Sequence, residues 1–194
     1  MFPLGSTVFP SQIVPLHVFE PRYQQLVEDL DELEVPTFGI VLIDRGHEVG
    51  GGDHRVDVAT RVEVLERQRL DDGRWAVVAA GVERIDIIDW LPDDPYPRAR
   101  TRSRERRDDG GGSLDDLESV LRETLSLAIP EDSPVEISFS VDPLTRLDQL
   151  SAVAPISTFD RQQVLEAETS AAQIDTLDRA LRGRREVLTA VSGL

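Results

Sequence analysis

The chain has 194 residues and carries 37 acidic against 21 basic side chains, which gives a net charge of −16 at neutral pH. A surface this acidic repels phosphate backbones, so general nucleic-acid binding is disfavoured. All basic residues are arginine and cysteine is absent, which excludes a Walker phosphate loop, a Ser-Lys peptidase dyad, a thiolate nucleophile and cysteine metal sites. We therefore expect a protein that neither hydrolyses ATP nor cleaves peptides with a Ser-Lys dyad.

The apolar content points to a globular protein outside the membrane. No apolar run approaches the roughly 18 residues of a membrane span, and the amino terminus lacks the basic and apolar regions of a secretion signal. We therefore expect a cytoplasmic protein. The length suits one domain of moderate size or two small ones.

Short apolar alternations dominate the first half of the chain. Residues 14–18 alternate as a half-buried strand would, and Pro21 opens a helix with proline at its first position. The core side of this helix would be formed by Tyr23, Leu26, Val27 and Leu30. Further strands are predicted at 38–43, 56–65, 75–80 and 85–91, with a hairpin turn at Asp72-Gly73.

The second half changes to helical spacing. Residues 108–113 are polar and glycine-rich, which is typical of a linker. After them, apolar residues recur at helical intervals from Leu114 to Ile129, from Leu144 to Val153, around Val164 and from about Ser170 onwards. The sequence thus predicts an α+β protein with a β-rich subdomain at 1–107, a linker at 108–113 and an α-helical subdomain at 114–194.

Several segments stand in an order and at a spacing that resemble the amino-terminal, substrate-binding domain of the Lon proteases. They are FPLGSTVFP from Phe2, PLHVFEPRY from Pro15, FGIVLI from Phe38, EVGGG from Glu48, the segment 90–99 and the segment 160–166. The resemblance implies a PUA-like β-barrel or pseudo-barrel followed by an α-helical bundle. It also implies a substrate-binding domain without the ATPase and peptidase that normally follow it.

The function that this resemblance implies is non-catalytic binding of polypeptides, either unfolded or degron-bearing chains or partner proteins. Such segments could bind by strand addition or in side-chain pockets. We predict a contact set of large apolar side chains, each of which could equally belong to the core. These residues are Phe19, Tyr23, Phe38, Ile40 and Trp90. The sequence leaves the oligomeric state open.

Five arginines alternate with other residues near the end of the first half. They are Arg98, Arg100, Arg102, Arg104 and Arg106. A strand here would present all five guanidinium groups on one face. Such an electrostatic patch could bind RNA phosphates, as an alternative function, or an acidic peptide. It could equally be an edge strand protected by its charge and neutralised by neighbouring acids, and we prefer this interpretation.

Two histidine-containing segments are candidates for reactive sites. His17 and Glu20 could form an acid–base pair, but a strand-to-helix junction would set them apart. His47, Glu48, Asp53 and His54 could ligate a metal ion, but the glycines between them favour a flexible turn. We predict no metal site and no cofactor.

Overall fold

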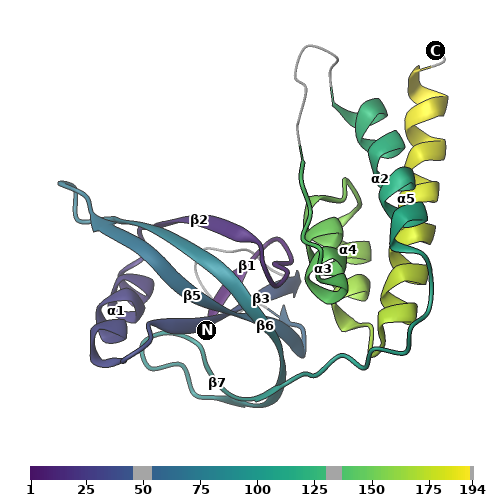
Figure 1. Ribbon diagram of the computed structural model, residues 1–194. Helices are drawn as coiled ribbons and strands as arrows, with labels where there is room; N and C mark the ends of the chain where they lie inside the picture. Colours follow the sequence, from purple (N-terminus) through teal and green to yellow (C-terminus); the bar gives the residue numbers. More distant parts are fainter. Residues whose placement is uncertain (46–53, 130–136, 193–194) are drawn as a thin grey trace. The chain divides into compact units, whose positions relative to one another are not determined.

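The computed structural model describes residues 1–45, 54–129 and 137–192, and these form two units, 1–104 and 105–194 (Figure 1). The division falls between Arg104 and Glu105, so the predicted linker at 108–113 lies within the second unit. The candidate metal segment from His47 to Asp53 lies outside the described residues, as does EVGGG. An α+β protein is confirmed, because strands fill the first unit and the second is helical.

Seven strands and one helix, followed by a short 3-10 turn, make up the described part of the first unit (Figure 1). The strands are β1 (Phe2–Leu4), β2 (Ile13–Val18), β3 (Thr37–Arg45), β4 (His54–Arg55), β5 (Val58–Arg69), β6 (Trp75–Leu91) and β7 (Arg98–Ser103). The helix α1 (Pro21–Asp29) begins with proline, as predicted, and the 3-10 turn η1 (Leu30–Glu32) extends it.

The strand order is β1-β3-β5-β6-β2, with β4 also paired to β3 and β7 also paired to β6. The β1–β3 pair is parallel and the other pairs are antiparallel. β5 and β6 form the long predicted hairpin, and Gly73 takes the positive φ of 84° that its turn requires. Within the described residues β1 and β2 therefore stand at the two ends of the strand order.

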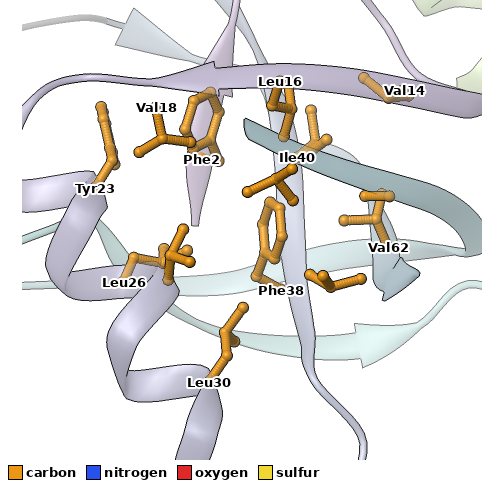
Figure 2. Close-up of a cluster of buried hydrophobic side chains, with 14 of the residues drawn as sticks. Phe2, Val14, Leu16, Val18, Tyr23, Leu26, Leu30, Phe38, Ile40 and Val62 are labelled. Carbon is orange, nitrogen blue, oxygen red and sulfur yellow. The ribbon is translucent and has the colours of Figure 1, made fainter. Parts of the chain in front are cut away.

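The core of the first unit lies between the sheet and α1 (Figure 2). Tyr23 and Leu26 of α1 point toward Phe2 of β1 and Phe38 of β3, and the rings of Phe2 and Tyr23 are 4.6 Å apart. A tilted aromatic pair at this distance adds about 0.5–1.5 kcal/mol to the stabilisation from burial alone. This packing fixes the start of α1 against β1 and β2.

Four helices make up the described part of the second unit: α2 (Leu114–Ala128), α3 (Pro143–Val153), α4 (Thr158–Glu166) and α5 (Ser170–Ser192). Ser113, Asp142 and Ser157 cap the first three, each accepting a hydrogen bond from a backbone N–H in the first turn. Fully buried leucines from all four helices form the core. None of the described helices combines the length and apolarity needed to cross a membrane.

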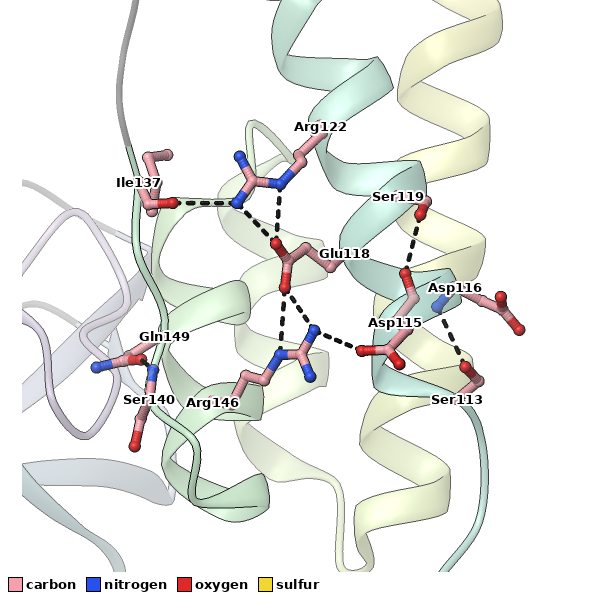
Figure 3. A network of polar contacts seen from close by, with 10 residues as sticks. All are labelled: Ser113, Asp115, Asp116, Glu118, Ser119, Arg122, Ile137, Ser140, Arg146 and Gln149. Atoms are coloured by element: carbon pink, nitrogen blue, oxygen red, sulfur yellow. Dashed lines mark hydrogen bonds and ion pairs between the residues drawn. The ribbon is translucent and has the colours of Figure 1, made fainter.

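Ion pairs join α2 to α3 on the surface of this unit (Figure 3). The Glu118 carboxylate accepts hydrogen bonds from Arg146 at 2.6 Å and from Arg122 at 2.8 Å. Arg146 also reaches Asp115 at 2.8 Å. These bonds, led by the one from Arg146, lower the pKa of Glu118 below its usual value. The network fixes the first half of α2 to α3.

The segment predicted as a linker lies against the beginning of α5. The Asp109 carboxylate accepts a 2.9 Å hydrogen bond from the backbone N–H of Ala171, and the Ser170 hydroxyl lies 2.9 Å from the same oxygen. Gly112 has a φ of 78°, and a Cβ there would come within 2.7 Å of Ile174. Glycine is needed at this position for both reasons. The polar, glycine-rich composition thus serves to cap and contact a helix.

Candidate functional site

An apolar groove of about 200 Å³ lies where β1, β2 and the start of α1 meet. It is lined by Phe2, Pro3, Leu4, Pro15, Leu16, His17, Val18, Phe19, Glu20 and Tyr23. All of these residues belong to the two segments, from Phe2 and from Pro15, that carry most of the resemblance to a known family. The groove, here called the β1–β2 groove, is therefore the part of the surface that those segments build.

Alternation along β2 determines which side chains reach the groove. Val14, Leu16 and Val18 are buried, whereas Pro15 and His17 are exposed, as the sequence pattern predicts for a half-buried strand. The groove is lined by buried and by exposed side chains of β2, because Leu16 and Val18 line it together with Pro15 and His17. The groove therefore runs along the edge of β2 and not over one of its two faces.

The polar rim of the groove is held in place by Arg22. Its guanidinium lies 4.5 Å from the centre of the Tyr23 ring and donates a 3.1 Å hydrogen bond to Glu20. The cation–π contact and the ion pair orient α1 at its first turn. Glu20 is thus engaged in positioning the helix. Among the described residues no group of three metal-ligating side chains is found.

The five predicted contact residues do not gather at one site. Phe19 is 52% exposed at the rim of the groove, whereas Tyr23, Phe38 and Ile40 are buried in the core (Figure 2). Packing α1 on the sheet covers most of the surface of these three side chains, and of the three only Tyr23 lines the groove. Trp90 lies apart, packed against the small cluster of Val41, Ala59 and Ile85, with the Arg55 guanidinium 4.8 Å from its ring.

The alternating arginines do not form a free cationic patch. Arg98, Arg100 and Arg102 lie on β7, where they pair with Asp94, Asp89 and Asp86 respectively. Arg104 follows the strand and also pairs with Asp86, at 2.6 Å. Burial raises the pKa of Asp86, but the hydrogen bonds from Arg102 and Arg104 together outweigh it and hold that pKa below its usual value. The ladder is therefore a neutralised edge strand.

Arg106 is not part of this ladder. It belongs to the second unit, where its side chain is 7% exposed and bonds the Asp148 carboxylate at 2.6 Å. It also donates to the side-chain oxygen of Gln173 at 2.6 Å and to the backbone oxygen of Leu144 at 2.9 Å. The prediction of five guanidinium groups on one face is thus wrong for Arg106, because β7 ends at Ser103 and the chain then enters the helical unit.

Sequence reasoning missed further exposed apolar residues on the outer side of β2 and on β5. Ile13 is 56% exposed, and Leu65 of β5 is 53% exposed. Leu65 lines a shallow hollow on this side together with Pro15 and His17. The signal was present in the alternation of β2, which places Ile13, Pro15, His17 and Phe19 on its exposed side. We call Ile13, Pro15, Phe19 and Leu65 the outer apolar row.

Comparison with known proteins identifies relatives over most of the chain. It is 26% identical to a protein named Lon protease 2 from Herpetosiphon aurantiacus, over 86% of this chain and 21% of the relative. It is 30% identical to Lon protease 2 from Sorangium cellulosum, over 95% of this chain and 24% of the relative. The chain therefore spans about a fifth to a quarter of the length of these proteases.

Solved structures share the fold. The crystal structure of a Lon N-terminal domain protein from Xanthomonas campestris has a TM-score of 0.66 at 21% identity, covering 91% of this chain and 94% of that one. The N-terminal domain of a Lon protease from the Mycobacterium avium complex has a TM-score of 0.57 at 16% identity, covering 95% and 96%. Residues 1–181 match the family described as the ATP-dependent protease La (LON) substrate-binding domain, and the chain belongs to that family.

Proposed function

We propose that this protein binds polypeptide segments, from unfolded or degron-bearing chains, without performing chemistry on them. The family is that of a substrate-binding domain, and the relatives align with this chain over only about a quarter of their length. The observation that carries the proposal is Phe19, an exposed phenylalanine at the rim of the β1–β2 groove and a member of the outer apolar row. Exposed apolar surface of this kind is typical of sites that bind polypeptides.

The expected affinity contribution follows from burial. Phe19 is about half exposed, and covering a phenylalanine side chain fully contributes about 1.5–3 kcal/mol. Burying the exposed half of Phe19 would thus contribute on the order of 1 kcal/mol, close to the 1.4 kcal/mol that changes a dissociation constant tenfold. Loss of this one ring should therefore weaken binding severalfold and leave the fold intact, because the ring lies outside the core.

The experiment measures binding of a fluorescently labelled, reduced and alkylated protein that cannot fold, with its native form as the comparison. Phe19→Ser should weaken binding of the unfolded form severalfold. The matched control is Phe159→Ser, which removes a phenylalanine that is 69% exposed in the second unit and should leave the affinity unchanged. Equal affinity for the native and unfolded forms, or equal losses in both variants, would contradict the proposal.

A further inference from the structure

The strand edges of the first unit are protected very unequally. An exposed edge offers unpaired N–H and C=O groups to other chains, so proteins shorten such strands, place charges on them or carry proline there. β1 has three residues and β4 has two, and β7 carries arginines that are ion-paired to acids on or next to β6. β2 has six residues, Ile-Val-Pro-Leu-His-Val, without a single carboxylate or arginine. It is the long edge that lacks charge protection among the described strands.

Pro15 identifies the groups that face the open edge of β2. Proline has no N–H, so in a sheet it stands where that position faces away from the partner strand. Alternate residues of an antiparallel strand point their N–H and C=O groups to the same side. Ile13, Pro15 and His17 therefore face the open edge. The 2.9 Å bond from the Gly81 N–H to the Gln12 oxygen, just before β2, agrees, because it places the carbonyl of an even-numbered residue on the β6 side.

We propose that a bound polypeptide segment adds to β2 as an extended strand, across the β1–β2 groove. The inference rests on the proposed function and specifies its binding mode. The segment would pair with the N–H groups of Ile13 and His17 and with the carbonyls of Ile13, Pro15 and His17. The groove runs along this same edge, so side chains on one side of the added strand would enter it.

This mode selects segments by pattern and not by a fixed sequence. Main-chain hydrogen bonds are common to all extended peptides, whereas alternate side chains must fit the apolar walls of Phe2, Leu16 and Val18. Apolar residues at every second position satisfy the requirement, and such runs are normally hidden as strands of a folded core. The site would therefore bind an unfolded chain through a segment that forms a buried strand when that chain is folded.

The test compares two substitutions of one residue. The probe is a labelled peptide of about ten residues that alternates valine and threonine, with arginine at both ends for solubility. His17→Pro removes one of the two N–H groups that the added strand would use, since Pro15 has none, while pairing to β6 uses the even-numbered residues. His17→Ala removes the same imidazole but keeps the N–H. We expect His17→Pro to weaken peptide binding at least about tenfold and His17→Ala to change it less than about threefold.

Amide hydrogen exchange on the wild-type protein gives a second measurement, which does not depend on whether His17→Pro folds. Peptide binding should slow exchange at the Ile13 and His17 amides, while Val14, Leu16 and Val18 are protected already by β6. Peptide binding without this protection, or with equal affinity in both His17 variants, would refute strand addition and leave polypeptide binding standing. Absence of binding to any unfolded chain would refute the proposed function itself. Protection of Ile13 and His17 that rises with protein concentration, without peptide, would show that a second copy occupies the edge.

Discussion

Arg106 and Arg100 belong to the same alternating series in the sequence, yet the structure gives them opposite environments. The Arg106 side chain is 7% exposed and its partner Asp148 is 10% exposed, whereas Arg100 is 69% exposed beside Asp89. Arg106 also binds Gln173 and Leu144. Replacing Arg106 by methionine keeps an apolar stem but leaves the Asp148 carboxylate buried without its cation.

The size of the effect follows from this difference. Removing one partner of a buried ion pair costs about 3–5 kcal/mol, because the remaining charge is uncompensated. Arg100→Met should cost less than about 1 kcal/mol, since exposed ion pairs contribute little. A domain has a total stability of about 5–15 kcal/mol, so Arg106→Met should bring the second unit close to unfolding. Adding Asp148→Leu should recover most of the loss by removing the stranded carboxylate.

Urea unfolding of the full chain can follow each unit separately. Both tryptophans, Trp75 and Trp90, lie in the first unit, so their fluorescence reports on the sheet. Circular dichroism at the helix band reports mainly on the second unit, which holds α2 to α5. Arg106→Met should shift the helix transition and leave the tryptophan transition in place. A loss no larger than that of Arg100→Met would refute the reasoning.

Three further predictions follow from the structure. The hydrogen bonds to Asp109, chiefly the one from the Ala171 N–H, lower the pKa of its carboxyl from 3.8 to about 2. A carboxyl whose pKa is lowered in the folded state contributes stability above pH 3.8, and this stability is lost as the pH falls toward 2. Asp109→Asn should therefore make the free energy of unfolding depend less steeply on pH in this acid range. Replacing Arg100, Arg102 and Arg104 together by serine should not change RNA retention, because the wild type should retain none at about 0.15 M salt; a steep salt dependence of RNA binding that the triple variant abolishes would contradict this. The pure chain should turn over neither ATP nor casein, since no lysine is available for a phosphate loop or a Ser-Lys dyad; turnover that survives repurification would disprove this.

Local patterns predicted the elements well, because they depend on neighbours within a few residues. The alternation at 14–18 gave β2, Pro21 gave the start of α1, and the helical spacing after residue 114 gave the α-helical unit. The same local pattern placed Tyr23 on the core side of α1, which conflicts with its use as a surface contact. In the structure Tyr23 is buried in the core. Residue type alone could not distinguish a core position from a surface contact.

Features that depend on distant partners were not predictable. The acids that neutralise Arg100 and Arg102 lie on β6, and their identity depends on a register with a bulge between Ile87 and Asp89. Asp148, the partner of Arg106, lies 42 residues away. The contacts of the glycine-rich segment with Ala171 and Ile174 come from a helix some 60 residues later. In each case the sequence showed the residue and only the fold showed its partner.

Net charge and the apolar groove would act on different steps of binding. The groove and the outer apolar row offer no free cation, so the lifetime of a complex would depend on apolar burial and main-chain hydrogen bonds, which salt screens little. The net charge of −16 acts over longer distances and accelerates the encounter with cationic segments. Unfolded segments flanked by lysine or arginine would therefore associate faster than acidic ones and dissociate at a similar rate. The charges that flank an apolar segment would then determine which segments bind fastest. The groove itself would discriminate only by the alternation of their side chains.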